Sequence, residues 1–269
     1  MNGSLLLRGM HGSTRALSAL SPRALAPLLA AFLSSLALTG SVARAQGTRT
    51  TVTNWNSWYV FSSDNAISEH WSLVTDVLLR REHGGDSPQQ TMVRPGILYQ
   101  VAPGVRIGGG YGYVVTYPYG GDPIAAPLPE HRLWEQVSLS QQVGNFALTH
   151  RYRLEQRWIG VGDPVTPSRV ASYREESRFR YFFRAIHNLG RPTGVFLQVY
   201  DEVFVTAGAS ARNNLLDQNR FFVGGGWRFT PMWRLEVGYM EQRIWKSSGL
   251  SAERNHTLSV TLHSTGPLR

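Results

Sequence analysis

The chain has no cysteine, almost no lysine and, after its first 45 residues, no long apolar run. Without cysteine it can form neither a disulfide framework nor a thiolate metal site, and its redox compartment stays undetermined. Lys246 is the one lysine among 27 basic residues. Beyond residue 45, no apolar stretch approaches the roughly 20 residues that a membrane-spanning helix needs, so residence in a membrane would depend on strands.

Residues 1–45 have the features of a secretory signal. Three arginines and no acidic residue precede an apolar run over residues 24–38, and Ala43-Arg44-Ala45 fits the small-x-small pattern of signal peptidase sites. We therefore expect export through the Sec pathway and cleavage after Ala45, which leaves residues 46–269 as one domain. The alternative is a buried helix of a soluble domain, but no other part of the chain has a helical period.

The positive charge does not have the pattern of a nucleic-acid surface. The formal net charge is +9, of which four charges lie in residues 1–45 and +5 remains for residues 46–269. A nucleic-acid interface gathers basic residues on one surface among aromatic side chains. Here arginines recur at every second position, so we expect no nucleic-acid partner. Arginine suits a narrow polar lumen because it keeps its charge and pairs with carboxylates, although a biased genomic base composition would produce the same excess.

Two segments show the clearest alternation of charged and apolar side chains. In the first segment the charged residues are Arg151, Arg153, Glu155 and Arg157. They alternate with Tyr152, Leu154, Gln156 and Trp158, which are mainly aromatic or aliphatic. Residues 173–184 repeat the pattern. The apolar rows have aromatic residues near their ends, as the outer face of a membrane barrel does, with polar residues turned inward. The pattern predicts a transmembrane antiparallel up-and-down β-barrel in a bacterial outer membrane.

Period-2 segments separated by turn residues predict the strands. No composition break marks a second domain. The predicted strands are 54–62, 69–81, 90–101, 104–117, 130–142, 145–159, 172–187, 193–206, 216–229, 232–246 and 253–263. If the tight turns are periplasmic, segment 54–62 must run downward, whereas the N-terminus of an exported barrel normally starts on the periplasmic side. Either residues 48–53 form a preceding strand or the N-terminal segment threads upward through the lumen. We expect twelve strands, with ten as the alternative.

The inward arginines and glutamates form the one constellation with clear physical consequences. Enclosed charges are costly unless they are paired, so each glutamate should lie against arginines. The lattice can be structural, or it can form a narrow anion-preferring constriction. The predicted lumen charge network consists of Arg132, Arg151, Arg153, Glu155, Arg157, Glu176, Arg178, Arg180, Glu202, Arg220, Arg228 and Glu236.

The register between segments 145–159 and 172–187 follows from like-charge avoidance. Placing Glu155 opposite Glu176 would set two carboxylates about 5 Å apart. A slide by two residues preserves the facing of every side chain and places Glu155 opposite Arg178 or, in the other sense, opposite Arg174. We therefore expect Glu155 to meet an arginine.

Other candidate sites are weaker. The alternative function is an outer-membrane acyl hydrolase that acts on phospholipid or lipopolysaccharide. Such an enzyme needs a serine that is activated by a histidine. The facing assignment turns His131, His150 and His256 outward and Ser138, Ser140 and Ser259 inward, so we expect no catalytic residue and no enzyme. No ligand spacing indicates a metal. A nucleotide-binding loop requires a helix directly after its glycines, and none follows Gly108-Gly109-Gly110 or Gly224-Gly225-Gly226. We therefore expect no cofactor. We interpret these glycines as room for side chains from the opposite wall.

The order of several motifs resembles a known family. The motifs include Glu130-x-Arg132-x-Trp134-x-Gln136, His150-Arg151-x-Arg153-x-Glu155-x-Arg157, Arg178-x-Arg180-Tyr181, Asp217-Gln218-Asn219-Arg220 and Gly238-Tyr239. Over about residues 52–263 the chain resembles a widespread bacterial family of outer-membrane proteins that carries a domain-of-unknown-function label (DUF2490-like). The resemblance implies an outer-membrane barrel and no established reaction. For such a barrel the expected partners are the lipid bilayer and lipopolysaccharide, with periplasmic chaperones and the barrel-assembly machinery during biogenesis.

Overall fold

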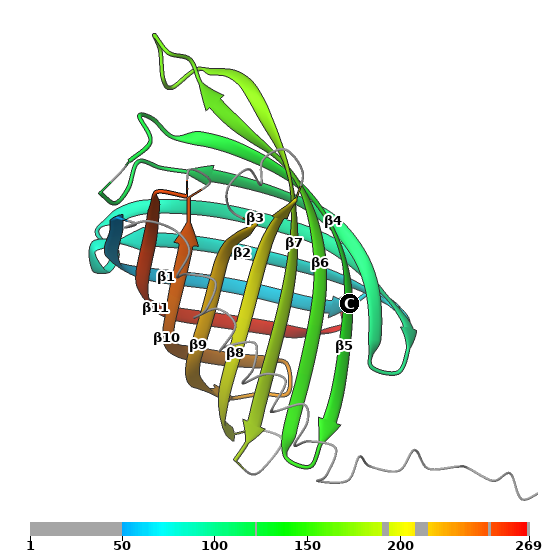
Figure 1. Cartoon of the computed structure of the whole chain (residues 1–269). Helices are drawn as coiled ribbons and strands as arrows, with labels where there is room; N and C mark the ends of the chain where they lie inside the picture. The colour runs from blue at the N-terminus through cyan, green and yellow to red at the C-terminus, as the bar shows by residue number, and fades with distance from the viewer. Residues whose placement is uncertain (1–49, 122, 190–193, 208–214, 247–248, 268–269) are drawn as a thin grey trace, which may run out of the picture. The chain divides into compact units, whose positions relative to one another are not determined.

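A computed structural model describes residues 50–121, 123–189, 194–207, 215–246 and 249–267, so the predicted signal at residues 1–45 lies outside the described residues. The described residues form a closed barrel of eleven strands (Figure 1). The elements are β1 (Thr50–Ala66), β2 (Trp71–Glu82), the 3-10 turn η2 (His83–Gly85), β3 (Ser87–Ala102), β4 (Val105–Thr116), β5 (Leu128–Val143), β6 (Phe146–Gly162), β7 (Val170–Asn188), β8 (Gly194–Ala207), β9 (Leu216–Arg228), β10 (Trp233–Trp245) and β11 (Ser251–Pro267). None of the helical structure in these ranges is long and apolar enough to cross a membrane.

The strand number corrects the prediction of twelve or ten strands. All eleven predicted segments are strands, but Thr50–Thr53 opens β1 and does not form a separate strand. β1 pairs antiparallel with β2 and parallel with β11. With an odd number of strands the first and last run in the same direction, so a parallel ladder closes the barrel where an even number would give an antiparallel one. The up-and-down order is otherwise as predicted, and the closed sheet is mixed.

The two ends of the barrel differ in their connections. Tight turns such as residues 103–104 and 144–145 lie at one end, and the connections over residues 117–127 and 163–169 lie at the other, which we call the long-connection end. The gap at residues 82–89 between two predicted strands is a shorter connection in the structure, because β2 ends at Glu82 and β3 begins at Ser87. β1 starts at the long-connection end, since Thr50 pairs with Ser251 just after the connection from β10 to β11.

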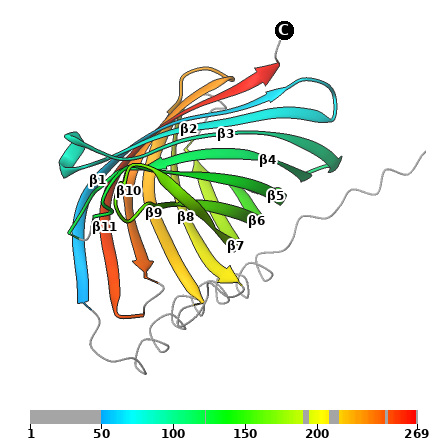
Figure 2. The ribbon, with the colours of Figure 1, turned by 90° about the horizontal axis from the view of Figure 1, so that it is seen from above.

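The strands are steeply inclined to one another across the barrel. In Figure 1, β1–β4 cross the direction of β7–β10 at a wide angle, and Figure 2 shows the strands fanning around the barrel when it is viewed from above. Strands that tilt relative to a barrel axis give this crossing between opposite walls.

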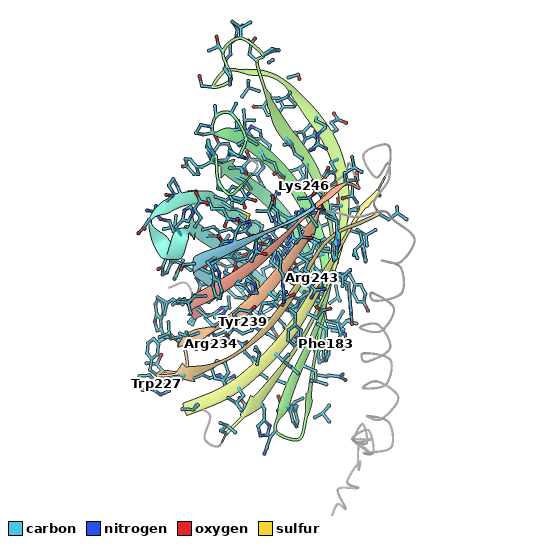
Figure 3. All side chains as sticks on the ribbon, turned by 60° about the vertical axis from the view of Figure 1, so that its left-hand side comes forward. Phe183, Trp227, Arg234, Tyr239, Arg243 and Lys246 are labelled. Carbon is cyan, nitrogen blue, oxygen red and sulfur yellow. The ribbon has the colours of Figure 1, made fainter. Side chains whose placement is uncertain are left out.

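Side chains divide between the faces as the alternation predicted. Large apolar and aromatic side chains cover the outer face, including Trp227, which is 57% exposed, and Tyr239 (Figure 3). Inward arginines and glutamates are buried or half-buried; Arg153 is 4% exposed and Glu155 has no exposed surface. The interior is not uniformly polar, because two small apolar clusters also lie inside. They consist of Trp58, Phe222 and Met240, and of Leu78, Met92 and Val114.

Three aromatic rings lie flat along the inner wall on glycines of neighbouring strands. A Cβ on Gly96 would lie 2.1 Å from Cζ2 of Trp134, and one on Gly110 would lie 2.7 Å from the same atom. Phe222 covers Gly224 and Gly238, and Phe196 covers Gly226, in the same way. These glycines therefore make room for rings from the same or nearby strands of one wall, and not for side chains from the opposite wall as the sequence suggested.

This packing predicts that Gly96→Ala destabilises the barrel by about 1–3 kcal/mol, the usual effect of overpacking. Gly112→Ala is the matched control, because its Cβ would have nearest contacts of 3.6 Å, to the Arg132 and Arg94 side chains. We expect the control to change the unfolding free energy by no more than about 0.5 kcal/mol. Urea unfolding of both variants in detergent micelles measures the difference. Equal unfolding free energies would show that the Trp134 ring moves aside without cost.

Candidate functional site

The charged side chains of β6 and β7 reach the interior because the pairing of the two strands places the charged row of one opposite the charged row of the other. In the observed register, Glu155 lies opposite Arg178 and Arg157 lies opposite Glu176. This is one of the two registers that like-charge avoidance allowed, and it confirms that Glu155 meets an arginine. Arg174, the other possible partner, pairs with Glu176 instead, at 2.8 Å.

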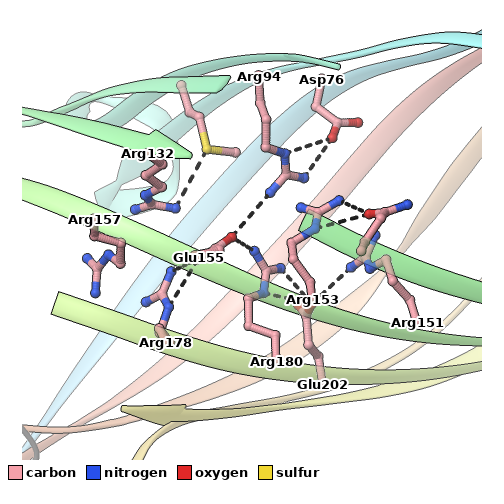
Figure 4. Close-up of polar contacts among 12 residues, drawn as sticks. Asp76, Arg94, Arg132, Arg151, Arg153, Glu155, Arg157, Arg178, Arg180 and Glu202 are labelled. Carbon is pink, nitrogen blue, oxygen red and sulfur yellow. Dashed lines mark hydrogen bonds and ion pairs between the residues drawn. The ribbon is translucent and has the colours of Figure 1, made fainter. Parts of the chain in front are cut away.

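Glu155 is the centre of the network and has no exposed surface (Figure 4). Its Oε2 accepts hydrogen bonds from Nη2 of Arg178 at 2.6 Å and from Nε at 3.2 Å, and its Oε1 accepts one from Nη1 of Arg180. Across the lumen, Nη1 of Arg94 lies 3.9 Å from Oε1, and Arg94 pairs in turn with Asp76 at 2.6 Å. One carboxylate on β6 thereby links β7 with β3 and, through Arg94, with β2.

Glu202 on β8 is a second centre. Its Oε1 accepts hydrogen bonds from Nη2 of Arg180 at 2.5 Å and from Nη2 of Arg151 at 2.9 Å. Nη1 of Arg220, on β9, lies 3.4 Å from Oε2. Because Arg180 contacts both Glu202 and Glu155, the two centres share a guanidinium group. Charge-assisted forks of this kind fix geometry as well as charge.

Two further carboxylates extend the network towards the ends of the barrel. Glu130 on β5 accepts from Nε of Arg132 at 2.5 Å and from Nε of Arg157 at 2.6 Å. Glu236 on β10 accepts from Nε of Arg234 at 2.8 Å and also lies 3.1 Å from Nε2 of His263. Both carboxylates are buried.

Buried aromatic rings complete the packing around the cations. The guanidinium carbons of Arg178, Arg180 and Arg220 lie 5.1, 4.6 and 4.5 Å from the centroid of Phe204. That of Arg153 lies 4.5 Å from Trp134. Each of these rings lies an even number of residues from an inward charged residue on its own strand, as Phe204 lies two residues after Glu202 on β8. The period-2 pattern could therefore have identified them, although the predicted lumen network contains charged residues only.

All twelve residues of the predicted network project into the lumen, and ten of them form ion pairs among the described residues. The other two bond to amides. Nη2 of Arg153 donates to Gln136 at 2.5 Å, and Nη1 of Arg228 donates to Asn188 at 2.6 Å. The predicted set omitted several charged residues that pair with its members, among them Asp76, Arg94 and Glu130. Each faces inward by the same alternation.

The histidines and serines of the alternative hydrolase lie on opposite faces of the wall. His131 and His256 hydrogen-bond outer-face tyrosines through Nδ1, each at 2.5 Å, and His150 bonds Tyr181 at 2.9 Å. Ser138 and Ser259 are buried on the inner face. Ser140 belongs to the inner row by the β5 alternation and lies opposite Thr149. Within the described part of the chain, no cluster of three or more histidine or acidic residues could hold a metal ion.

The geometry predicts that Glu155→Gln destabilises the barrel by about 3–5 kcal/mol. Removing one partner of a buried ion pair leaves guanidinium charge uncompensated, here on Arg178 and Arg180. Glu69→Gln is the control, because Glu69 is exposed between β1 and β2. Chemical unfolding in detergent measures both variants. If Glu155→Gln unfolds with the same free energy as Glu69→Gln, the network contributes nothing to stability.

Comparisons with known proteins add the family. The model of the family described as "Protein of unknown function (DUF2490)" matches residues 55–253, which include most of the barrel. No curated protein and no solved structure matches the chain significantly. The chain therefore belongs to the DUF2490 family of proteins of unknown function.

Proposed function

We propose that this protein is an outer-membrane β-barrel of a Gram-negative bacterium, without enzymatic activity, that serves as a structural barrel or as a very narrow, anion-preferring pore. The observation that supports this most is the inverted polarity of the barrel. Its interior holds buried ion pairs such as Glu155 with Arg178, and its outer face exposes large apolar side chains. A closed barrel with apolar side chains outward satisfies all backbone groups within a bilayer. The signal predicted in residues 1–45 agrees with export.

Lipid would then contact the outer face, with lipopolysaccharide as the outer-leaflet partner. Periplasmic chaperones and the barrel-assembly machinery would act during biogenesis only. The separation of histidines from serines across the wall favours a barrel without catalytic residues over an acyl hydrolase, because a base must reach its nucleophile within hydrogen-bonding distance.

The packing at mid-height favours a closed lumen over a conducting one. Glu155, in mid-strand of β6, and Met240, in mid-strand of β10, have no exposed surface, so solvent does not reach them from either end. Porins, in contrast, keep a water-filled interior.

We expect the purified protein to give no resolved conductance steps in planar bilayers and to release no acyl chains from phospholipid or lipopolysaccharide. Anion-selective steps would assign the narrow pore, and acyl release would assign the hydrolase. A porin of known conductance, reconstituted in the same way, is the positive control for insertion.

Membrane residence is tested by an arginine at two matched positions. Val223, mid-strand in β9, is 51% exposed and lies opposite Tyr239 and Val199. Val195, the second residue of β8, is 56% exposed. In lipid, Val223→Arg should destabilise the barrel by about 2–4 kcal/mol and Val195→Arg by about 0–1 kcal/mol, because the cost falls from the bilayer centre to its interface.

Unfolding in lipid vesicles measures this difference. If both variants change stability by less than about 0.5 kcal/mol, as exposed positions of a water-soluble barrel do, the membrane location is wrong. Leu154 would be a poorer position, because Leu154 lies opposite Glu135 on the outer face and an arginine there would gain an ion-pair partner.

A further inference from the structure

A polar cavity of about 170 Å³ lies inside the barrel near the long-connection end. Arg80, Arg132, Arg157, Arg178 and Arg220 line it, with Asp217 as its one carboxylate and four glutamine amides between them. These residues come from β2, β3, β5, β6, β7, β9 and β10, and most of them lie in the half of their strand that faces the long connections. The cavity is therefore a part of the lumen that the mid-height packing leaves open.

The connection between β4 and β5 folds across this end of the lumen. The hydroxyl of Tyr119 donates to Oε2 of Glu253 at 3.2 Å, and the backbone N–H of Gly120 donates to Oε2 of Glu82 at 2.8 Å. Burial, and then the neighbouring Glu253 carboxylate, raise the pKa of Tyr119, so the hydroxyl keeps its proton as a donor. Tyr119 thereby joins the cavity lining from outside the strands.

The carboxylates that compensate the cavity arginines lie mostly outside it. Arg132 and Arg157 bind Glu130, and Arg157 also binds Glu176. Arg178 binds Glu155, and Arg220 is 3.4 Å from Glu202. Glu155 and Glu202 also serve Arg180, so their charge is divided among several cations. The lining of the cavity consequently has an excess of positive charge.

Arg80 has the least compensated charge of the five. Its guanidinium stacks on Trp58 at 3.8 Å, and Nη1 donates to Oε1 of Gln90 at 2.7 Å. Among the described residues no carboxylate lies within ion-pairing distance of Arg80, and its Nε is buried without a hydrogen-bond partner. A buried cation in this state is costly unless an anion reaches it.

We propose that this cavity is a binding site for a phosphate-class oxyanion. Guanidinium forks pair with phosphate oxygens in a bidentate manner, which suits a tetrahedral oxyanion better than a monatomic ion. The cavity holds roughly five times the volume of one water molecule in the liquid, which is room for one such group. Free phosphate and the phosphate of a lipid headgroup share this chemistry. The inference concerns the lumen of the proposed barrel, but it does not require the barrel to lie in a membrane.

Calorimetric titration of the purified protein in detergent with sodium phosphate, at ionic strength held constant with chloride, tests the site. We expect saturable binding of one phosphate, weakened at least tenfold in Arg80→Gln. Arg106→Gln is the matched control, because Arg106 is an inward arginine near the tight-turn end that pairs with Asp64 at 2.7 Å. The control should bind phosphate as the unchanged protein does.

Asp217→Asn gives a second test, in which the affinity for phosphate should rise instead of fall. This test is needed if Arg80→Gln does not fold. Asp217 pairs with Arg178 at 3.2 Å, and its removal takes the one carboxylate out of the lining. Phosphate should then bind at least fivefold more tightly. No saturable heat beyond that of chloride, or unchanged binding in the variants, would overturn the site.

Phosphatidic acid added to the micelles separates the two sources of the phosphate group. Competition with inorganic phosphate identifies a site that accepts a headgroup, and lack of competition identifies one for free phosphate. If the protein binds phosphate but tolerates Val223→Arg, only the membrane location is refuted. If Val223→Arg destabilises the barrel in lipid but the protein binds no phosphate, only the phosphate site is refuted.

Discussion

Closure of the sheet by the parallel ladder between β1 and β11 determines what else the chain can do. The ladder pairs Thr50 through Ala66 with Ser251 through Pro267, so neither terminal strand is left with an open edge. An open edge would expose unpaired backbone groups, which is unfavourable in lipid and prone to aggregation in water. Closure also fixes which side chains are enclosed, and it makes the compensation of charge in the interior obligatory.

Compensation within that enclosure is shared and not strictly pairwise. Arg180 serves both Glu155 and Glu202, and Glu130 serves both Arg132 and Arg157. Because several of these groups have more than one partner, the strands that carry them are coupled across the lumen as well as through the backbone ladder. Buried ion pairs contribute little net stability compared with apolar packing, but breaking one of them is costly.

The sequence predicted the parts of the structure that depend on local alternation and on charge. Period 2 identified all eleven strands and their faces, and repulsion between Glu155 and Glu176 excluded the wrong register. The strand number was wrong because alternation identifies faces but not neighbours, and an even number was assumed. Nothing in the local sequence reveals that β1 pairs parallel with β11. The position of the Trp134 ring over Gly96, and the fold of residues 117–127 across the lumen, depend on tertiary contacts that one sequence does not show.

The positions of the carboxylates explain how a filled barrel can still offer a site. Glu155 and Glu202 lie at mid-height, where they draw Arg178, Arg180 and Arg151 together, and Arg178 also borders the cavity. Nearer the long-connection end the arginines continue, but Asp217 is the one carboxylate in the cavity lining. The balance of charge therefore changes along the axis, from compensated at the centre to positive near one end. A barrel built in this way can resist conduction and still hold an anion, because the two properties arise from different levels of the same network.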